Sequence, residues 1–249
     1  MIRRISLILL LTLLAPRSFA AAQEADTIDP QANQVLQQMG EYLGSLEHFR
    51  VRAEAAADEV IDTGQLIAFG HTVDMVVRRP DRLWVDVNGD IGHKRVLYDG
   101  RTARLLDYTY GTVAQTEGRA TIEATIDDLI DRLGVVVPLA ELAFDDPYAT
   151  LIGNVETGSY LGIRVVDGIE YHHLAFTQET IDWEVWIENG ARPLPRKLLI
   201  RYKGEPGSPQ FVAILSDWDL ADASPDALFS SQTPIGMTPI EFIDVGGDR

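Results

Sequence analysis

The sequence predicts an α+β fold: a strongly curved antiparallel sheet of about eleven strands, with an N-terminal helix and a second helical segment against its concave face. Three observations support this prediction. Most of the chain alternates apolar and polar residues with a period of two, which is typical of half-buried antiparallel strands. Turn dipeptides such as Asn-Gly and Asp-Gly separate these segments. Because each strand rotates by about 20–25° on its neighbour, so many strands in one sheet must curl.

The first twenty residues are expected to form a secretory signal peptide. Arg3 and Arg4 are its basic region, residues 5–15 are apolar, and small residues precede a cleavage site after Ala20. The apolar segment is too short to span a hydrocarbon core of about 30 Å. We expect 1–20 to be removed, 21–28 to be a flexible arm because it has no periodicity, and 29–249 to form a single domain without linker or repeat.

Charge and cysteine content exclude several classes of partner. The chain has a net charge of −17, and loss of residues 1–20 removes three arginines and no acid, which brings the charge near −20. Such a chain repels phosphate backbones and anionic lipid head groups. It has no cysteine, which excludes disulfides, thiolate metal sites and the cysteine that anchors a bacterial lipoprotein. We therefore expect a soluble monomer with no nucleic-acid partner and no membrane anchor.

The first predicted element of the domain is an amphipathic helix over residues 30–46. Asp29 is a good acceptor at its N-terminus and Pro30 fits the first turn. Gly40 and Gly44 each weaken the helix by about 1 kcal/mol relative to alanine, so it requires tertiary packing. The period then changes to two, and the alternation predicts strands at 48–60, 65–79, 82–88, 93–98, 101–109, 112–117, 150–166, 169–178, 181–188, 196–203 and 210–219.

Residues 121–144 interrupt the series of strands. Apolar residues recur there at helical spacing up to Gly134, which ends the pattern, and residues 138–144 predict a short third helix. The tail has one helical turn at 224–229 and then a short extended end.

The motifs of common enzymes are missing from the sequence. It contains no Gly-x-Ser-x-Gly elbow, no His-Glu-x-x-His, no phosphate-binding glycine loop and no dinucleotide fingerprint. His172 and His173 are adjacent, so in a strand they point to opposite faces and cannot share a metal ion. We expect no enzyme activity, no cofactor and no metal site.

The alternation places a set of apolar side chains on the concave face, with the helical insert over them. The predicted lining is Met75, Val77, Leu83, Val85, Leu105, Trp183, Val185, Leu198 and Ile200 from the strands, and Ile126, Leu129, Ile130 and Leu133 from the insert. Two interpretations remain open. These side chains line a hollow that binds an apolar ligand, or helices and sheet close on each other as a plain core.

Three segments carry a resemblance to a known family. They are Gly64-Gln65-Leu66, residues 75–85 with the step Arg79-Pro80, and residues 96–103 with the step Asp99-Gly100. Together they resemble the periplasmic outer-membrane lipoprotein carrier superfamily, LolA, whose core is a strand, Arg-Pro, a strand, Asp-Gly and a strand after an N-terminal helix. Phe229 and Pro234-Ile235-Gly236-Met237 are similar to the family's closing segment. The closest resemblance is to a group of predicted periplasmic proteins of unknown function that share this fold.

The resemblance implies an unclosed β-barrel with a helical lid, here about residues 121–144, over a cavity that takes acyl chains. It also implies periplasmic localisation. Arg79 stands where the family's arginine hydrogen-bonds the lid backbone and holds the lid shut. From the residues alone, the preferred explanation of Arg79 is a charged side chain on the surface at the end of a strand.

Our leading hypothesis is a soluble periplasmic binding or carrier protein that shelters an apolar ligand, such as a lipid or a lipoprotein acyl chain, and has no chemical step. An envelope protein is the expected acceptor. The alternative is an envelope-stress sensor or protein-interaction domain of the same fold without transport activity. The sensors that resemble this family carry a further C-terminal domain, for which the sequence leaves no room.

Overall fold

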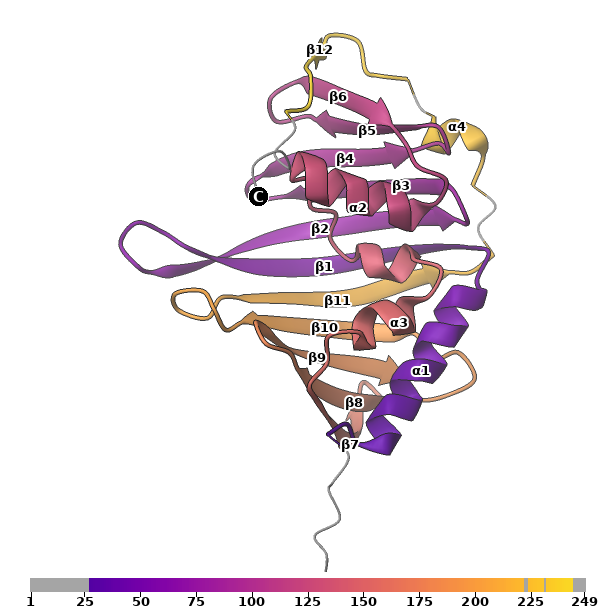
Figure 1. The fold of residues 1–249 in the computed structure, drawn as a ribbon, viewed down its shortest axis with the longest axis vertical. Coiled ribbons are helices and arrows are strands. Elements are labelled where there is room, and N and C mark those ends of the chain that lie inside the picture. The colour runs from indigo at the N-terminus through magenta and orange to yellow at the C-terminus, as the bar shows by residue number, and fades with distance from the viewer. Residues whose placement is uncertain (1–26, 222–223, 231, 244–249) are drawn as a thin grey trace, which may run out of the picture.

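In the computed structural model, which describes residues 27–221, 224–230 and 232–243, twelve strands form one sheet. They are β1 (His48–Val60), β2 (Leu66–Arg78), β3 (Arg82–Gly89), β4 (Gly92–Tyr98), β5 (Thr102–Asp107), β6 (Thr112–Glu117), β7 (Thr157–Val166), β8 (Ile169–Thr177), β9 (Ile181–Glu188), β10 (Pro195–Tyr202), β11 (Gln210–Asp219) and β12 (Thr238–Pro239). Their spatial order is β12-β6-β5-β4-β3-β2-β1-β11-β10-β9-β8-β7 (Figure 1). The predicted curved, unclosed antiparallel sheet is confirmed.

The two longest strands, β1 and β2, lie in the middle of the sheet. They pair over their full length, from His48 opposite Arg78 to Val60 opposite Leu66, and β11 pairs with the other edge of β1. Side chains alternate as the sequence predicts: Phe49 and Val51 are buried on the concave face, whereas Arg52 points to the other face and forms an ion pair with Asp74 of β2.

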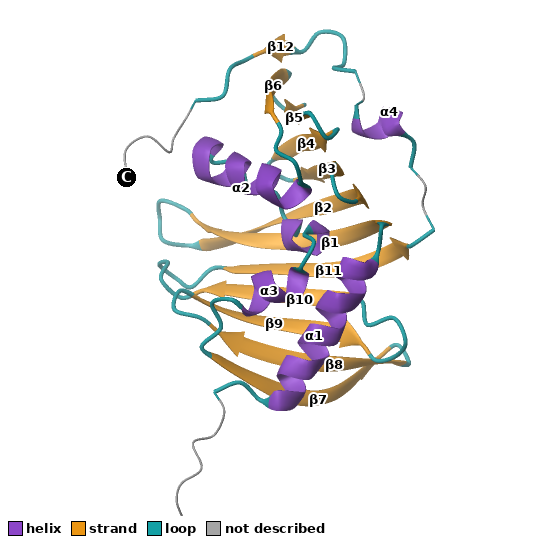
Figure 2. Cartoon of the chain, turned by 45° about the vertical axis from the view of Figure 1, so that its right-hand side comes forward, coloured by secondary structure: helices purple, strands orange, loops and turns teal. Residues whose placement is uncertain are grey.

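The helices α1 (Pro30–Ser45), α2 (Ile122–Leu133) and α3 (Pro147–Ile152) and the 3₁₀ turn η1 (Ala140–Ala143) lie on one face of the sheet (Figure 2). A one-turn helix, α4 (Asp226–Phe229), contacts β3. None of the helices in the described part of the chain is long and apolar enough to cross a membrane.

The glycines of α1 have a packing role that helix propensity does not reveal. A Cβ added to Gly40 would lie 2.5 Å from the Cβ of Tyr148 in α3, and one added to Gly44 would lie 2.8 Å from the carbonyl oxygen of Asp145. Both glycines therefore allow α3 to approach α1 closely, and a hydrogen bond of 2.7 Å from the Tyr148 hydroxyl to Asn33 joins the two helices.

Three sequence predictions need correction. Residues 150–156 are not part of a strand: α3 begins after Asp146, whose side chain caps Ala149 N–H at 2.9 Å, and β7 begins only at Thr157. The expected helix at 138–144 is a four-residue 3₁₀ turn, because Leu139 before it has a left-handed φ of 61°. Thr27 and Ile28, expected in the flexible arm, pair with Gly158 of β7. The predicted signal peptide and residues 21–26 lie outside the described residues.

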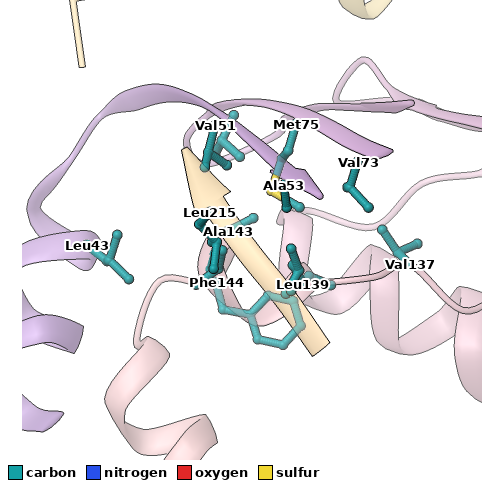
Figure 3. Packing of buried hydrophobic residues seen from close by; sticks show 14 of the residues in the cluster. Leu43, Val51, Ala53, Val73, Met75, Val137, Leu139, Ala143, Phe144 and Leu215 are labelled. Carbon is teal, nitrogen blue, oxygen red and sulfur yellow. The ribbon is translucent and has the colours of Figure 1, made fainter. Parts of the chain in front are cut away.

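The main hydrophobic core fills the space between the helices and the concave face. Figure 3 shows Val51, Met75 and Leu215 of the sheet packed towards Ala143 and Phe144 of the lid segment. A smaller cluster on the opposite face consists of Leu97, Leu106 and Val113, with Met237 of the C-terminal segment against it. This segment continues as β12, which pairs with β6 in parallel and covers that edge of the sheet.

Candidate functional site

The chain between α2 and η1 crosses the concave face, and a cavity lies on each side of it. Cavity A, of about 340 Å³, is lined by Val85, Val87, Lys94, Val96, Leu105 and the segment 134–138. Cavity B, of about 320 Å³, is lined by Ala57, His71, Val136, Val137, Pro138, Leu139, Glu141, Leu198, Ile200, Tyr202 and Phe211. Val136, Val137 and Pro138 contribute to both, so the two cavities adjoin at this segment, and we call them together the groove.

A third hollow, cavity C, continues from cavity B towards α1. It holds only about 30 Å³ and is lined by Met39, Leu139, Glu141, Leu142, Leu151, Trp183, Val185, Pro195, Leu198 and Leu215. Leu139, Glu141 and Leu198 line both B and C. The lining of all three cavities is predominantly apolar, which is typical of sites for small apolar ligands.

The crossing segment, residues 134–139, is extended because α2 ends at Leu133. Gly134 adopts a left-handed φ of 63° and donates to the carbonyl of Ile130, which ends the helix. Val137 is then buried beneath the segment, while Val136 is 76% exposed above it. We call this segment, residues 134–139, the strap: Val136 is exposed on its outer side, whereas Val137 and Leu139 pack into the main core.

The predicted lining residues separate into two groups. Val85 and Leu105 line cavity A, Leu198 and Ile200 line cavity B, and Trp183, Val185 and Leu198 line cavity C. Five others are fully packed between helices and sheet and line none of the three cavities: Met75, Val77, Leu83, Ile126 and Leu129. The two interpretations left open by the sequence, a plain core and a hollow, thus each describe part of the concave face.

Two residues of α2 lie elsewhere. Ile130 is 42% exposed and lines none of these cavities, because it points away from the sheet next to buried Leu129. Leu133 lines a separate cavity D, of about 660 Å³, between β6, the end of α2 and the C-terminal segment around Ile240.

Several lining residues were missed at the level of sequence. Val87, His71 and Tyr202 continue the alternation of predicted members on their strands and could have been found by extending it. Ala57 and Phe211 lie on β1 and β11, from which no lining residue was predicted, and Glu141 lies on an irregular turn that has no strand periodicity.

Cavity B contains three polar side chains in an otherwise apolar lining. Glu141 remains exposed as a residue, but apolar neighbours surround its carboxyl and the loss of hydration raises its pKa. Burial, with the negative charges of Glu205 and Glu141, also raises the pKa of Tyr202. The ring of His71 lies 6.2 Å from that of Phe211.

Arg79 joins β2, the end of α1 and the η1 turn. Its guanidinium donates to the carbonyl of Leu46 at 2.7 Å, and to those of Leu142 and Phe144 at 3.2 Å and 2.7 Å. The side chain is only 9% exposed, and its Nε lies 3.7 Å from Asp145. Burial lowers the pKa of this arginine, and Asp145 opposes that shift. The arginine of the Arg-Pro step thus hydrogen-bonds the backbone of the segment that the sequence predicts as the lid.

Among the described residues, no group of three or more His, Asp or Glu side chains is arranged to hold a metal ion. His173 instead pairs with Glu184 at 2.8 Å, and His172 bonds the hydroxyl of Tyr160 at 2.9 Å.

Comparison with solved structures finds chains of similar fold at low identity. The lipoprotein LppX of Mycobacterium tuberculosis is 17% identical, with a TM-score of 0.47 over 79% of this chain and 98% of that one. A LolA superfamily protein from Nitrosomonas europaea is 14% identical, with a TM-score of 0.34 over 80% and 96%. LprF of Mycobacterium bovis is 12% identical, with a TM-score of 0.45 over 79% and 96%.

Comparison of sequences gives the family. None of the curated protein sequences compared with the chain matches it. The family model described as "Predicted periplasmic protein (DUF2092)" matches residues 32–243, which include all twelve described strands and all but the first two residues of α1. This match confirms the resemblance to a group of predicted periplasmic proteins. The chain belongs to the DUF2092 family of predicted periplasmic proteins.

Proposed function

We propose that this protein is a periplasmic binding or carrier protein that shelters an apolar ligand, such as a lipid or a lipoprotein acyl chain, without a chemical step. The observation that carries the proposal is the groove beneath residues 134–139. Cavities A and B, of about 340 and 320 Å³, each have a volume within the range of about 300–1,000 Å³ that is usual for small-molecule sites.

The energetics suit reversible binding. Each methylene moved from water into an apolar site contributes about 0.8 kcal/mol, so a few buried methylenes stabilise a complex appreciably. The strap over the groove is short and its central residue, Val136, is exposed.

Arg79 has a defined part in this proposal. Its hydrogen bonds to Leu142 and Phe144 fix η1, and η1 contributes Glu141 and Leu142 to cavities B and C. We propose that Arg79 holds the lid, residues 121–144, closed over the groove and thereby slows release of the ligand.

The proposed localisation rests on the predicted signal peptide, residues 1–20. We propose that residues 1–20 direct export and are removed after Ala20, which agrees with the description of the family as predicted periplasmic proteins. The ligand would then come from an envelope membrane, and the acceptor would be a protein of the same compartment.

The proposal is tested by purifying the protein from the periplasm of its own cells and extracting it with organic solvent for lipid mass spectrometry. We expect a bound lipid or acylated species in near-stoichiometric amount, which a fluorescent fatty acyl probe competes away. A protein that is free of ligand and also does not bind the probe would contradict the proposal.

A further inference from the structure

Three polar side chains from separate parts of the chain converge in cavity B. Glu141 comes from η1, His71 from β2 and Tyr202 from β10. Within the described part of the chain, neither His71 nor Tyr202 makes a side-chain hydrogen bond, and the Glu141 carboxylate has only its own backbone N–H. None of the three residues is fully buried, so a ligand group in the cavity can take the place of water beside their polar atoms.

The charge of this cluster selects among possible head groups. Glu141 is the acid of cavity B, and no lysine or arginine lines cavity B or cavity C. Because charges interact more strongly where apolar groups exclude water, a carboxylate or phosphate placed beside Glu141 would be repelled, whereas a cation would be attracted.

The hydrogen-bond acceptors of the cluster also favour a cationic head group. A primary ammonium carries three donors and no acceptor. An ionised Glu141, the hydroxyl of Tyr202 and a neutral His71 each offer an acceptor lone pair, and the faces of Phe211 and Tyr202 are suited to a cation as well. An ammonium group in cavity B therefore finds acceptors among its lining residues and no competing lysine or arginine.

We propose that cavity B binds the primary ammonium group of a long-chain amphiphile, whose apolar tail lies along Val136–Pro138 towards cavity A. This inference rests on the proposed function and adds the class of head group. A simple long-chain amine and an aminophospholipid share this chemistry, and the experiment separates them.

The test compares ligands of equal chain length by isothermal titration calorimetry, below their critical micelle concentrations. The probes are dodecylamine, dodecanol and dodecanoate, with lauroyl lysophosphatidylethanolamine and lauroyl lysophosphatidylglycerol as the phospholipid pair. We expect dodecylamine to bind at least about ten-fold more tightly than dodecanoate. A preference for the ethanolamine over the glycerol head would extend the site to aminophospholipids, and equal affinity for these two would limit it to simple amines.

The variant Glu141→Gln keeps the size of the side chain and removes its charge. It should reduce the ratio of amine to carboxylate affinity to near one and leave dodecanol within about two-fold of the wild type. The matched control is Glu205→Gln, which removes a nearby charge that does not line the cavity. It should retain the preference, whereas attraction to the net charge of −17 alone would affect both variants alike.

An amine-to-carboxylate ratio that is the same in the wild type and in Glu141→Gln would overturn the inference. The outcomes also distinguish it from the proposed function. If every probe binds without regard to its head group, only the inference fails, and if no probe binds, both fail.

Discussion

Arg79 shows how one side chain can support both the fold and the site. Its planar guanidinium reaches three backbone carbonyls from two separate segments, a geometry that an ammonium group cannot reproduce. Its neighbour Arg78 points to the other face, where it forms an ion pair with Asp226 and lies 5.2 Å from the ring of Phe229. Two adjacent arginines therefore hold different segments on opposite faces of the sheet.

Replacement of Arg79 should affect stability and ligand release together. We expect Arg79→Leu to lower the free energy of unfolding by about 2–4 kcal/mol, because the three carbonyls lose a charged donor. The release of a bound fluorescent acyl probe, followed by stopped-flow fluorescence, should become faster. Arg78→Leu is the matched control and should leave the release rate unchanged. Equal release rates in the wild type and in Arg79→Leu would remove Arg79 from the lid mechanism.

Glu141 should make amine binding depend on pH. The raised pKa means that its carboxyl keeps a proton to a higher pH than the ordinary value of 4.5. An ammonium ligand requires the ionised form, so affinity for dodecylamine should fall as the pH decreases through this raised pKa, while affinity for dodecanol stays constant. His71 also lines the cavity. The variant His71→Asn should keep the pH dependence of dodecylamine affinity. If this variant loses the pH dependence, the effect belongs to the histidine and not to Glu141.

The strap between α2 and η1 is the element that distinguishes a groove from a closed core. It is extended because Gly134 ends α2 and because Leu139 adopts a left-handed conformation before η1. Between these two points the chain is too short to fill the space above β3 to β5 and β10. The cavities are thus a consequence of how two short helical elements are connected.

A charge on the strap should weaken binding without unfolding the protein. Val136 is 76% exposed and lines both cavities A and B. We expect Val136→Asp to reduce the affinity for an acyl probe about ten-fold, and to change the free energy of unfolding by less than about 0.5 kcal/mol, as is usual for surface sites. Val165→Asp, at a position 64% exposed in β7, is the control. Unchanged affinity in Val136→Asp would show that the ligand does not contact the strap.

The contact between α1 and α3 gives a prediction that opposes helix propensity. At an exposed helical site, glycine to alanine stabilises by about 1 kcal/mol. At Gly40 the added methyl would meet Tyr148 at 2.5 Å, so we expect Gly40→Ala to destabilise the protein by about 1–3 kcal/mol in urea unfolding. Gln38→Ala, at an exposed position of the same helix, should be close to neutral. A more stable Gly40→Ala variant would contradict the close packing.

At the level of the whole molecule, periodicity was sufficient to predict the sheet, its curvature and which side chains face the helices. It could not separate core from cavity. Met75 and Leu105 obey the same alternation, yet Met75 is packed solid and Leu105 lines a hollow, because the difference depends on what lies above them. The six-residue helix α3 was missed since its pattern is too short, and its position is set by α1.

The pairing at the two edges of the sheet could not be predicted from local sequence patterns either. Thr238 and Pro239 pair with β6 across more than a hundred residues of sequence, and Ile28 covers the start of β7. Each contact joins two segments that are far apart in the sequence, so it can be seen only in the folded chain.

The most direct test of the central claim, that the groove is hollow and takes an apolar guest, is to fill it. Leu198 lines cavities B and C, while Leu199 is the next residue of β10 and points to the opposite face. We would titrate Leu198→Trp and Leu199→Trp with a fluorescent fatty acyl probe and record the thermal midpoint of each. We expect saturable binding in the wild type and in Leu199→Trp, and a loss of affinity of about ten-fold or more in a folded Leu198→Trp. Equal binding in the two variants would contradict the claim.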